Sequence, residues 1–264
     1  GQKYALSDLR TFQKATNTPL DTPYNIGGGE IESCNVGQCD EGSLDLQYIN
    51  ALCHTTGVIY WEVADDVFVD NFIVQVSNDP NPPTVISISY TLPETSTSRS
   101  YYDAFNQQAV SLGLRGVTIM ASSGDSGVNQ RGCGTKGCWY TALFPASSPW
   151  VTSVGATQGH VPSSSEDQSY PSLTYEQACS VGTGGIITTG GGFSTLFPRP
   201  AWQEAQVSAY FATAAAAGKT PTSGYSTTGR GYPDVSMNGI QYPVRDTLAY
   251  AVTLDALLSF PCHL

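Results

Sequence analysis

Two acidic residues one helical turn apart are the first candidates for chemistry in this sequence. Glu41 and Asp45 are four positions apart, so their side chains point the same way on a helix. Asp45 also falls on an apolar stripe, where a carboxylate is costly unless it is paired or protonated. Two such carboxyls can share a proton, which makes the pair a base in acid. The alternative is an ordinary helix start, because negative charge stabilises a helix N-terminus.

A third candidate, Asp125, lies in the Gly-flanked turn of residues 123–127 (SGDSG). A carboxylic acid that keeps its proton could donate a hydrogen bond to a developing oxyanion. The alternative is a turn residue that bonds to its own backbone. The same letters resemble the nucleophile segment of chymotrypsin-like proteases, which needs an upstream His and Asp on an all-β double barrel. The only upstream histidine is His54, on a helical face, and the neighbouring segments indicate an α/β fold.

The elements around these residues predict a parallel sheet covered by helices. Residues 43–55 form a helix with Leu44, Tyr48, Ile49 and Leu52 on one stripe. Buried strands are predicted at residues 84–90, 116–122 and 150–156, and a helix at residues 98–114 carries a stripe of Tyr102, Phe105, Ala109 and Leu112. In such sheets ligands bind beyond the carboxyl ends of the strands, where Asp125 falls.

The remaining elements complete one domain without repeats or linkers. They are a short helix at 4–16 that opens at Ser7 or Asp8, loop or edge structure at 17–42, a strand at 67–76, turns at 157–192 and an Ala-rich helix at 201–217. A further short helix is predicted at 246–258. The Gly-rich residues 182–192 lack the Lys-Ser/Thr of a phosphate loop, so we expect them to let chains pass closely. Trp139, Trp150 and Trp202 are expected in the core or a cleft wall.

Composition excludes several classes of partner. The chain of 264 residues has a formal net charge of −11, which argues against nucleic acid or an anionic membrane surface, because both need a basic face. The same balance suits a protein that works in acid, where carboxylates become neutral. No apolar run reaches membrane-spanning length. The sequence starts at Gly1 without the charged and apolar regions of a signal peptide, so a processed protein or a fragment is expected.

Seven cysteines offer two interpretations. Cys34 and Cys39 lie close together, as do Cys133 and Cys138, which suits local disulfides in an oxidising compartment. The alternative is a zinc site built from these four residues, although their spacing is loose for zinc. Because the number is odd, the true partner of one cysteine is expected to be missing.

Five segments together resemble motifs of one family, in the same order. They are residues 41–49 (EGSLDLQYI), 86–90 (ISISY), 122–127 (SSGDSG), 191–203 (GGFS to FPRPAWQ) and 229–236 (GRGYPDVS). The family is the sedolisins, the serine-carboxyl peptidases, and the likeness extends from about residue 4 to 243. It implies an α/β, subtilisin-like parallel sheet flanked by helices, and it favours the functional interpretation of the three acidic residues.

The resemblance implies a role for each candidate. Glu41 would be the general base of a nucleophilic serine, Asp45 would orient Glu41 and share its proton, and Asp125 would line the oxyanion hole. A strand would pair with the substrate backbone, and its residues are Ser89, Tyr90 and Thr91. Because the family commonly has Gly in place of Thr91, we expect this residue to narrow the cleft.

The sequence departs from the family after Ser236. The family continues to a Gly-Thr-Ser segment that carries the nucleophile and then to a calcium loop; neither is found here, so we expect a C-terminally truncated fold without cofactor. Residues 1–243 are predicted as a partial peptidase domain and residues 244–264 as an unrelated tail. Ser123 and Ser126 would lie in the oxyanion wall, so neither replaces the nucleophile.

Three functional hypotheses follow from the resemblance. The first is a serine-type peptidase of acidic environments, an endopeptidase or tripeptidyl-peptidase, inactive in this chain without its nucleophile. The second is a non-catalytic pseudo-peptidase that binds peptides, and the third is a fragment that does not fold stably. A peptide or protein substrate is the expected partner, without nucleic acid or membrane span. The expected location is extracellular or a lysosome- or vacuole-like acidic compartment.

Overall fold

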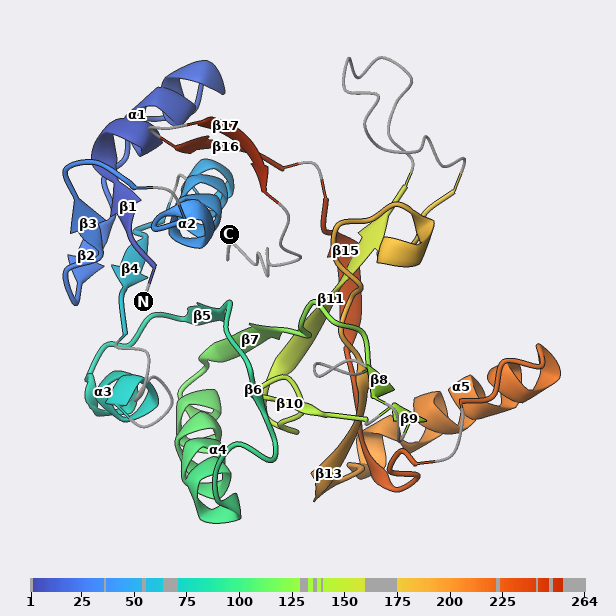
Figure 1. The fold of residues 1–264 in the computed structure, drawn as a ribbon. Helices are drawn as coiled ribbons and strands as arrows, with labels where there is room; N and C mark the ends of the chain where they lie inside the picture. The colour runs from blue at the N-terminus through green and yellow to red at the C-terminus, as the bar shows by residue number, and fades with distance from the viewer. Residues whose placement is uncertain are drawn as a thin grey trace.

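The structure is a computed structural model. It describes residues 2–35, 37–53, 56–63, 71–128, 133–134, 137–138, 140–159, 175–221, 224–240, 242–246 and 249–253. Figure 1 shows the N-terminal elements at one end of the molecule and the central sheet with its helices beside them.

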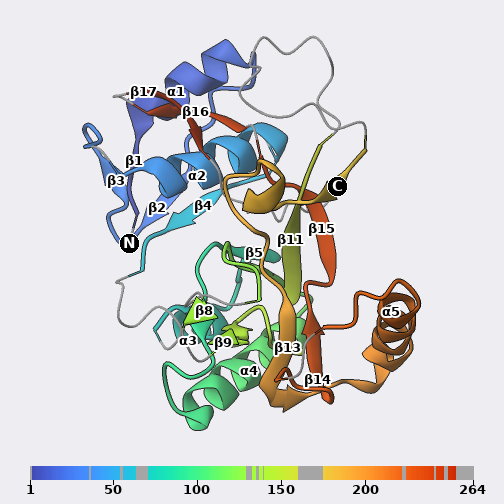
Figure 2. The same ribbon diagram turned by 45° about the vertical axis from the view of Figure 1, so that its right-hand side comes forward.

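A mainly parallel sheet forms the centre of the fold (Figures 1 and 2). Its parallel strands are β5 (Val85–Ile88), β7 (Thr118–Ser122), β11 (Thr152–Gln158) and β15 (Val235–Asn238), and β12 (Gln177–Ala178) pairs antiparallel with β11. The three strands predicted from short β-branched runs are therefore confirmed. Because β5, β7 and β11 are parallel, their carboxyl ends meet at one edge of the sheet.

Helix α4 (Arg99–Leu114) connects β5 to β7 and packs on the sheet. The predicted stripe of Tyr102, Phe105, Ala109 and Leu112 is buried, with exposed fractions of 3% or less. These side chains share the main core cluster with Ile86 and Ile88 of β5. The helical period therefore located both the helix and its buried face.

The predicted strand at residues 67–76 is wrong over its described part. Helix α3 (Ile73–Asn78) occupies this stretch, while residues 64–70 lie outside the described residues. Ile73 and Val76 are three positions apart and both are buried in the main core cluster. Packing of this helical face overrides the strand preference of β-branched residues.

The N-terminal elements form a second layer around α2 (Asp40–Leu52). They are β1 (Tyr4–Ala5), α1 (Leu6–Ala15), β2 (Tyr24–Ile26), β3 (Glu30–Ile31) and β4 (Ile59–Trp61). β1 pairs with β3 and β2 pairs with β4, both in parallel. Loop or edge structure was expected in residues 17–42, where β2 and β3 lie, and the helices predicted at 4–16 and 43–55 are confirmed with shifted ends.

The buried face of α2 differs from its predicted stripe. Leu44, Leu46 and Gln47 are buried, whereas Leu52 is 55% exposed and Asp45 is half-buried. The cause is that α2 is packed from two directions. Leu46 lies in a cluster with residues of β1 and α1, while Gln47 faces the C-terminal hairpin.

The helix predicted at residues 246–258 is wrong over its described part. Strands β16 (Tyr242–Asp246) and β17 (Ala249–Thr253) form an antiparallel hairpin, and residues 254–264 lie outside the described residues. The side chain of Gln47 accepts from the Arg245 N–H and donates to the Arg245 carbonyl, at 2.9 and 2.6 Å. These bonds dock β16 on α2, so the hairpin is held by tertiary contacts that a local pattern does not contain.

The rest of the chain packs against the other end of the sheet. Its elements are β6 (Leu92–Pro93), β8 (Cys133–Gly134), β9 (Gly137–Cys138), β10 (Leu143–Phe144), β13 (Gly192–Pro198), a 3-10 turn (Ala201–Gln203), α5 (Glu204–Ala216) and β14 (Gly229–Tyr232). The predicted Ala-rich helix is confirmed. Trp150 and Trp202 are 56% and 59% exposed, so the expectation of a core position is wrong for both; they border a shallow pocket. Trp139 lies outside the described residues.

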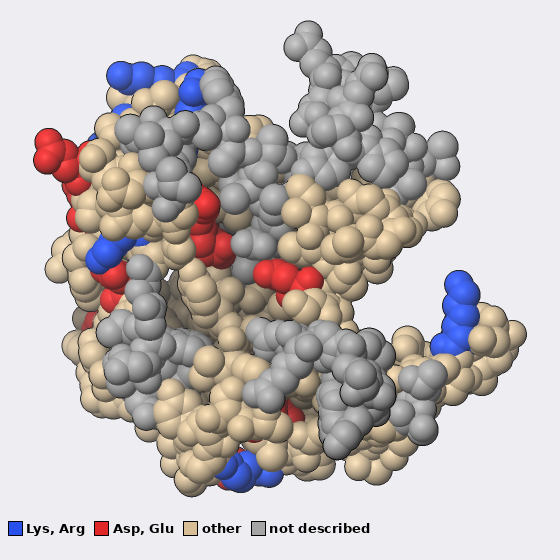
Figure 3. All heavy atoms as spheres, viewed as in Figure 1, with Lys and Arg blue, Asp and Glu red and all other residues tan. Residues whose placement is uncertain are grey.

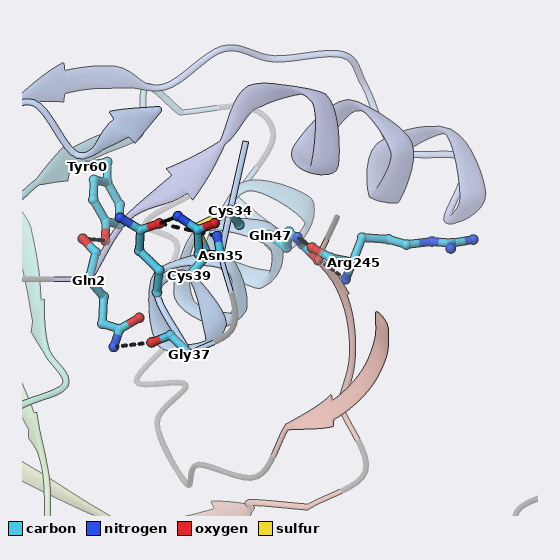
Figure 4. Close-up of a disulfide and its surroundings, with 9 residues drawn as sticks. Gln2, Cys34, Asn35, Gly37, Cys39, Gln47, Tyr60 and Arg245 are labelled. Atoms are coloured by element: carbon cyan, nitrogen blue, oxygen red, sulfur yellow. Dashed lines mark hydrogen bonds between the residues drawn. A yellow bond between two sulfur atoms is a disulfide. The ribbon is translucent and has the colours of Figure 1, made fainter. Parts of the chain in front are cut away.

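A disulfide joins Cys34 and Cys39 immediately before α2 (Figure 4). This confirms one predicted local pair and removes both sulfurs from the alternative zinc site, because a disulfide sulfur is not a thiolate ligand. Cys53 is also disulfide-bonded, and Cys179 is a buried free thiol. In the part of the chain that the structure describes, no helix has the length and apolar character to cross a membrane.

Candidate active site

Helix α2 presents the two predicted acidic residues to one pocket. Glu41 lies in the first turn and Asp45 one turn later, and both are half-buried. They line a pocket of about 790 Å³ that also contains Ser89, Tyr90 and Thr91. The structure therefore brings the predicted carboxylate pair and the predicted substrate strand to one place.

A hydrogen bond joins α2 to the strand end. The Ser89 hydroxyl donates to Asp45 Oδ2 at 2.5 Å, and the Ser122 hydroxyl donates to the Ser89 carbonyl at 3.2 Å. Ser89 follows β5 directly and Ser122 is the last residue of β7. The carboxylate of Asp45 is thus fixed to the edge where the parallel strands end.

Asp125 lies three residues beyond β7, at the same edge of the sheet. Its side chain is exposed, while its carbonyl accepts from the Thr188 N–H at 2.9 Å. The preceding Gly124 has φ +97°, and its carbonyl accepts from the Gly190 N–H at 2.5 Å. A Cβ on Gly190 would overlap the Ser123 carbonyl, so the Gly-rich segment does pass closely behind this turn, as predicted.

Thr91 lies near Gly124 of the Asp125 turn. A Cβ built on Gly124 would lie 4.0 Å from Thr91 Oγ1 and would overlap Leu143 Cδ1. Tyr90, by contrast, is 49% exposed over the pocket. Asp125 is not among the described residues that line this pocket; it lies in the turn that contains Gly124, beyond the end of β7. Figure 3 shows Asp and Glu side chains, in red, near the centre of the face that is turned to the viewer.

Tyr60 and Gly42 lie beside the acidic pair, and neither was predicted as part of the site. The Tyr60 hydroxyl donates to the Gln2 carbonyl at 2.9 Å (Figure 4), and burial raises the Tyr60 pKa well above its usual range, with a further contribution from the negative charge of Asp45. A Cβ on Gly42 would lie 2.5 Å from Tyr60 Oη and would overlap the Lys3 carbonyl. The sequence feature that could have indicated this contact is Gly42 itself, between Glu41 and Asp45. Glycine inside a helix is unfavourable, so it indicates a packing reason.

The serines of this region hold structural positions in the fold. Ser123 is buried at the start of the Asp125 turn, and Ser236 lies in strand β15. The Ser194 hydroxyl donates to the buried Glu94 carboxylate at 2.5 Å and accepts from the Phe197 N–H at 2.8 Å. Ser89 bonds directly to the acidic pair, and its hydroxyl holds Asp45 in place.

Several known proteins are similar in sequence to most of this chain. Physarolisin of Physarum polycephalum is 31% identical over 266 residues, which is 91% of this chain and 45% of that protein. Tripeptidyl-peptidase SED2 of Arthroderma otae is 30% identical over 84% of this chain and 37% of its own length. Tripeptidyl-peptidase 1 of Bos taurus is 31% identical over 74% of this chain and 32% of its own length. The chain therefore spans less than half the length of these relatives.

A solved structure supports the fold. Pseudomonas sedolisin, a serine-carboxyl proteinase, matches 89% of this chain and 62% of its own with a TM-score of 0.60 and 23% identity. The expected subtilisin-like parallel sheet flanked by helices is thereby confirmed. No family model matches the chain. From the curated relatives and the shared fold together, the chain belongs to the sedolisin family of serine-carboxyl peptidases.

Proposed function

We propose that this chain forms the carboxylate and peptide-binding part of an acid-acting serine-carboxyl peptidase site. Glu41 is the base, Asp45 orients it and shares its proton, and Asp125 is a neutral donor at the oxyanion position. The observation that carries the proposal is the Ser89–Asp45 hydrogen bond, which ties the acidic helix to the sheet edge beside the Asp125 turn. The acid range follows because a carboxyl group donates a hydrogen bond only while it is protonated.

The substrate in this proposal is an extended peptide lying along Ser89, Tyr90 and Thr91. An edge segment of this kind holds a peptide by main-chain hydrogen bonds, and neighbouring pockets select its side chains. Thr91 is proposed to narrow the cleft, and Tyr90 offers an exposed ring to the peptide. The proposed location is extracellular or an acidic compartment, which the Cys34–Cys39 disulfide supports.

The chain alone is proposed to bind peptides without cleaving them. No Gly-Thr-Ser segment occurs in the sequence, and loss of the nucleophile of a subtilisin-type protease lowers turnover about a million-fold. The calcium loop that the family resemblance implies would follow that segment, so no residue of this chain is proposed to bind calcium. Endopeptidase or tripeptidyl-peptidase activity needs a site with a nucleophile, so neither activity is proposed for the chain alone.

The experiment measures binding and labelling of the purified chain at pH 4. We expect saturable binding of an unstructured peptide, no cleavage products, and no labelling by a serine-directed fluorophosphonate. Tyr90→Ala and Asp125→Ala weaken binding, whereas Tyr210→Ala, which alters a tyrosine of similar exposure on α5, does not. Fluorophosphonate labelling would contradict the absence of a nucleophile, and equal affinity of all variants would contradict the proposed site.

A further inference from the structure

Glu94 is a buried carboxylate that the proposed site does not use. It lies three residues beyond Thr91, at the end of the segment that carries the predicted substrate strand, and it is 4% exposed. A buried charge is costly unless an opposite charge or hydrogen bonds compensate it. Among the ion pairs of the described residues, none involves Glu94. The compensation therefore comes from hydrogen bonds.

Three donors from strand β13 hold this carboxylate. The Ser194 hydroxyl donates to Oε1 at 2.5 Å, and the Thr195 N–H and hydroxyl donate to Oε2 at 2.8 and 2.7 Å. The Ser194 oxygen in turn accepts from the N–H groups of Leu196 and Phe197, at 3.1 and 2.8 Å. The β13–β14 ladder is irregular along this stretch. The two side chains thus supply acceptors that the ladder does not offer to these N–H groups.

The same segment of chain also holds the Asp125 turn. The Gly190 N–H donates to the Gly124 carbonyl at 2.5 Å. The Thr188 N–H donates to the Asp125 carbonyl at 2.9 Å. Residues 188–195 are therefore bonded to the Asp125 turn at one end and to the buried carboxylate at the other.

The main chain around Glu94 has supports of its own. Strand β6 pairs with β10 (Figure 1), and the Pro93 carbonyl accepts from the Tyr102 hydroxyl at 2.8 Å. The Glu94 N–H donates to the Ala142 carbonyl at 2.9 Å. These contacts hold β6 without the Glu94 side chain. What the carboxylate adds is a direct link from the end of β6 to residues 188–195.

We propose that Glu94 is a positioning residue of the peptide site. Its carboxylate fixes residues 89–93 relative to the Asp125 turn, and it does so through residues 188–195. Thr91 lies near Gly124, so a shift of either segment changes the width of the proposed cleft. The inference rests on the proposed function, because it concerns a peptide that lies along residues 89–91 and reaches Asp125.

Glutamine in place of Glu94 tests the two acceptor oxygens. It keeps nearly the same shape, but one acceptor oxygen becomes an NH₂ donor. In one orientation this donor meets the Ser194 hydroxyl, whose oxygen already accepts from two N–H groups. In the other orientation it meets the Thr195 N–H. Because both orientations place a donor against a donor, we expect Glu94→Gln to bind an unstructured peptide about fivefold more weakly, an effect typical of residues that act without touching the ligand.

Two further variants separate positioning from stability. Ser148→Ala removes a buried hydrogen bond to Asn106, at 2.6 Å, outside the two linked segments. We expect it to unfold at a lower urea concentration and to keep its peptide affinity while it is folded. Thr195→Val removes one of the three donors at an exposed position, so it should fold and bind peptide about twofold more weakly. It decides the question if Glu94→Gln does not fold.

Amide hydrogen exchange distinguishes this inference from the proposed function. In Glu94→Gln, the N–H groups of Thr188 and Gly190 should exchange at least about fivefold faster, a larger change than in α4, which reports global unfolding. This result is expected even if the wild-type chain binds no peptide, which would reject the proposed function alone. The inference is overturned if exchange at both residues changes no more than in α4. It is also overturned if wild type and both linked variants, Glu94→Gln and Thr195→Val, bind peptide equally well.

Discussion

Ser89 donates a hydrogen bond to Asp45 from 44 positions away along the chain, at 2.5 Å. The bond crosses from the end of β5 to the second turn of α2, so it fixes the distance between the sheet edge and the acidic helix. The Cys34–Cys39 disulfide anchors the chain just before the same helix. The disulfide before α2 and the long-range hydrogen bond to Ser89 thus both restrain the position of the acidic pair.

Replacing Ser89 tests this dependence. Ser89→Ala removes the donor to Asp45, and we expect the free energy of unfolding to fall by about 1.5 kcal/mol, the contribution of a hydrogen bond to a charged group. Ser89→Thr keeps a hydroxyl and is expected to retain most of the stability. Urea unfolding measures both variants, and peptide titration measures whether the site moves. An Ala variant with unchanged stability and peptide affinity would show that the bond has no such role.

Gly42 is expected to tolerate no side chain. In Gly42→Ala the new Cβ overlaps the Lys3 carbonyl, which costs about 1–3 kcal/mol and outweighs the helix preference of alanine. The matched control is Gly113→Ala in α4, where a Cβ meets nothing within 4 Å, so stability should rise by about 0.5 kcal/mol. Thermal unfolding of both variants checks the sign, and stabilisation by Gly42→Ala would contradict the close approach of the chain before β1.

Local sequence patterns were sufficient to predict three strands of the central sheet and helix α4. The strands β5, β7 and β11 are short apolar runs between turn residues, and the stripe of α4 repeats at helical spacing. Because ligands bind beyond the carboxyl ends of parallel strands, the sequence also predicted that Asp125 lies at that edge of the sheet. In the structure Asp125 lies three residues beyond β7, while residues 89–91 line the pocket with Glu41 and Asp45.

Long-range contacts account for what the sequence could not predict. Helix α3 and the β16–β17 hairpin are short apolar stretches whose period does not separate helix from strand, and packing decides both. Tyr60 comes within reach of Gly42 only because β4 folds back on the start of α2. The shift of the buried face of α2 has the same origin, since the docked hairpin is remote in sequence.

Cys179 is expected to react only after unfolding. Burial raises the pKa of its thiol, and the negative charge of Asp125 adds to this effect. Both burial and a low thiolate fraction slow alkylation. Iodoacetamide labelling at pH 8 should therefore modify Cys179 slowly in buffer and rapidly in denaturant, as peptide mass mapping would show. Rapid native labelling would contradict the buried position of this residue.

Tyr48 links alkaline stability to docking of the hairpin. Its hydroxyl donates to the Pro243 carbonyl at 3.0 Å, and burial, with a smaller contribution from Tyr242, raises the Tyr48 pKa from 10.0 to about 12. Because the raised pKa belongs to the folded state, this stabilisation is complete below pH 10 and is lost as pH rises through 12. Tyr48→Phe should lose about 1 kcal/mol at pH 8 and show a shallower decline between pH 10 and 12. Urea unfolding across this range measures the difference, and parallel declines of variant and wild type would exclude Tyr48 as its source.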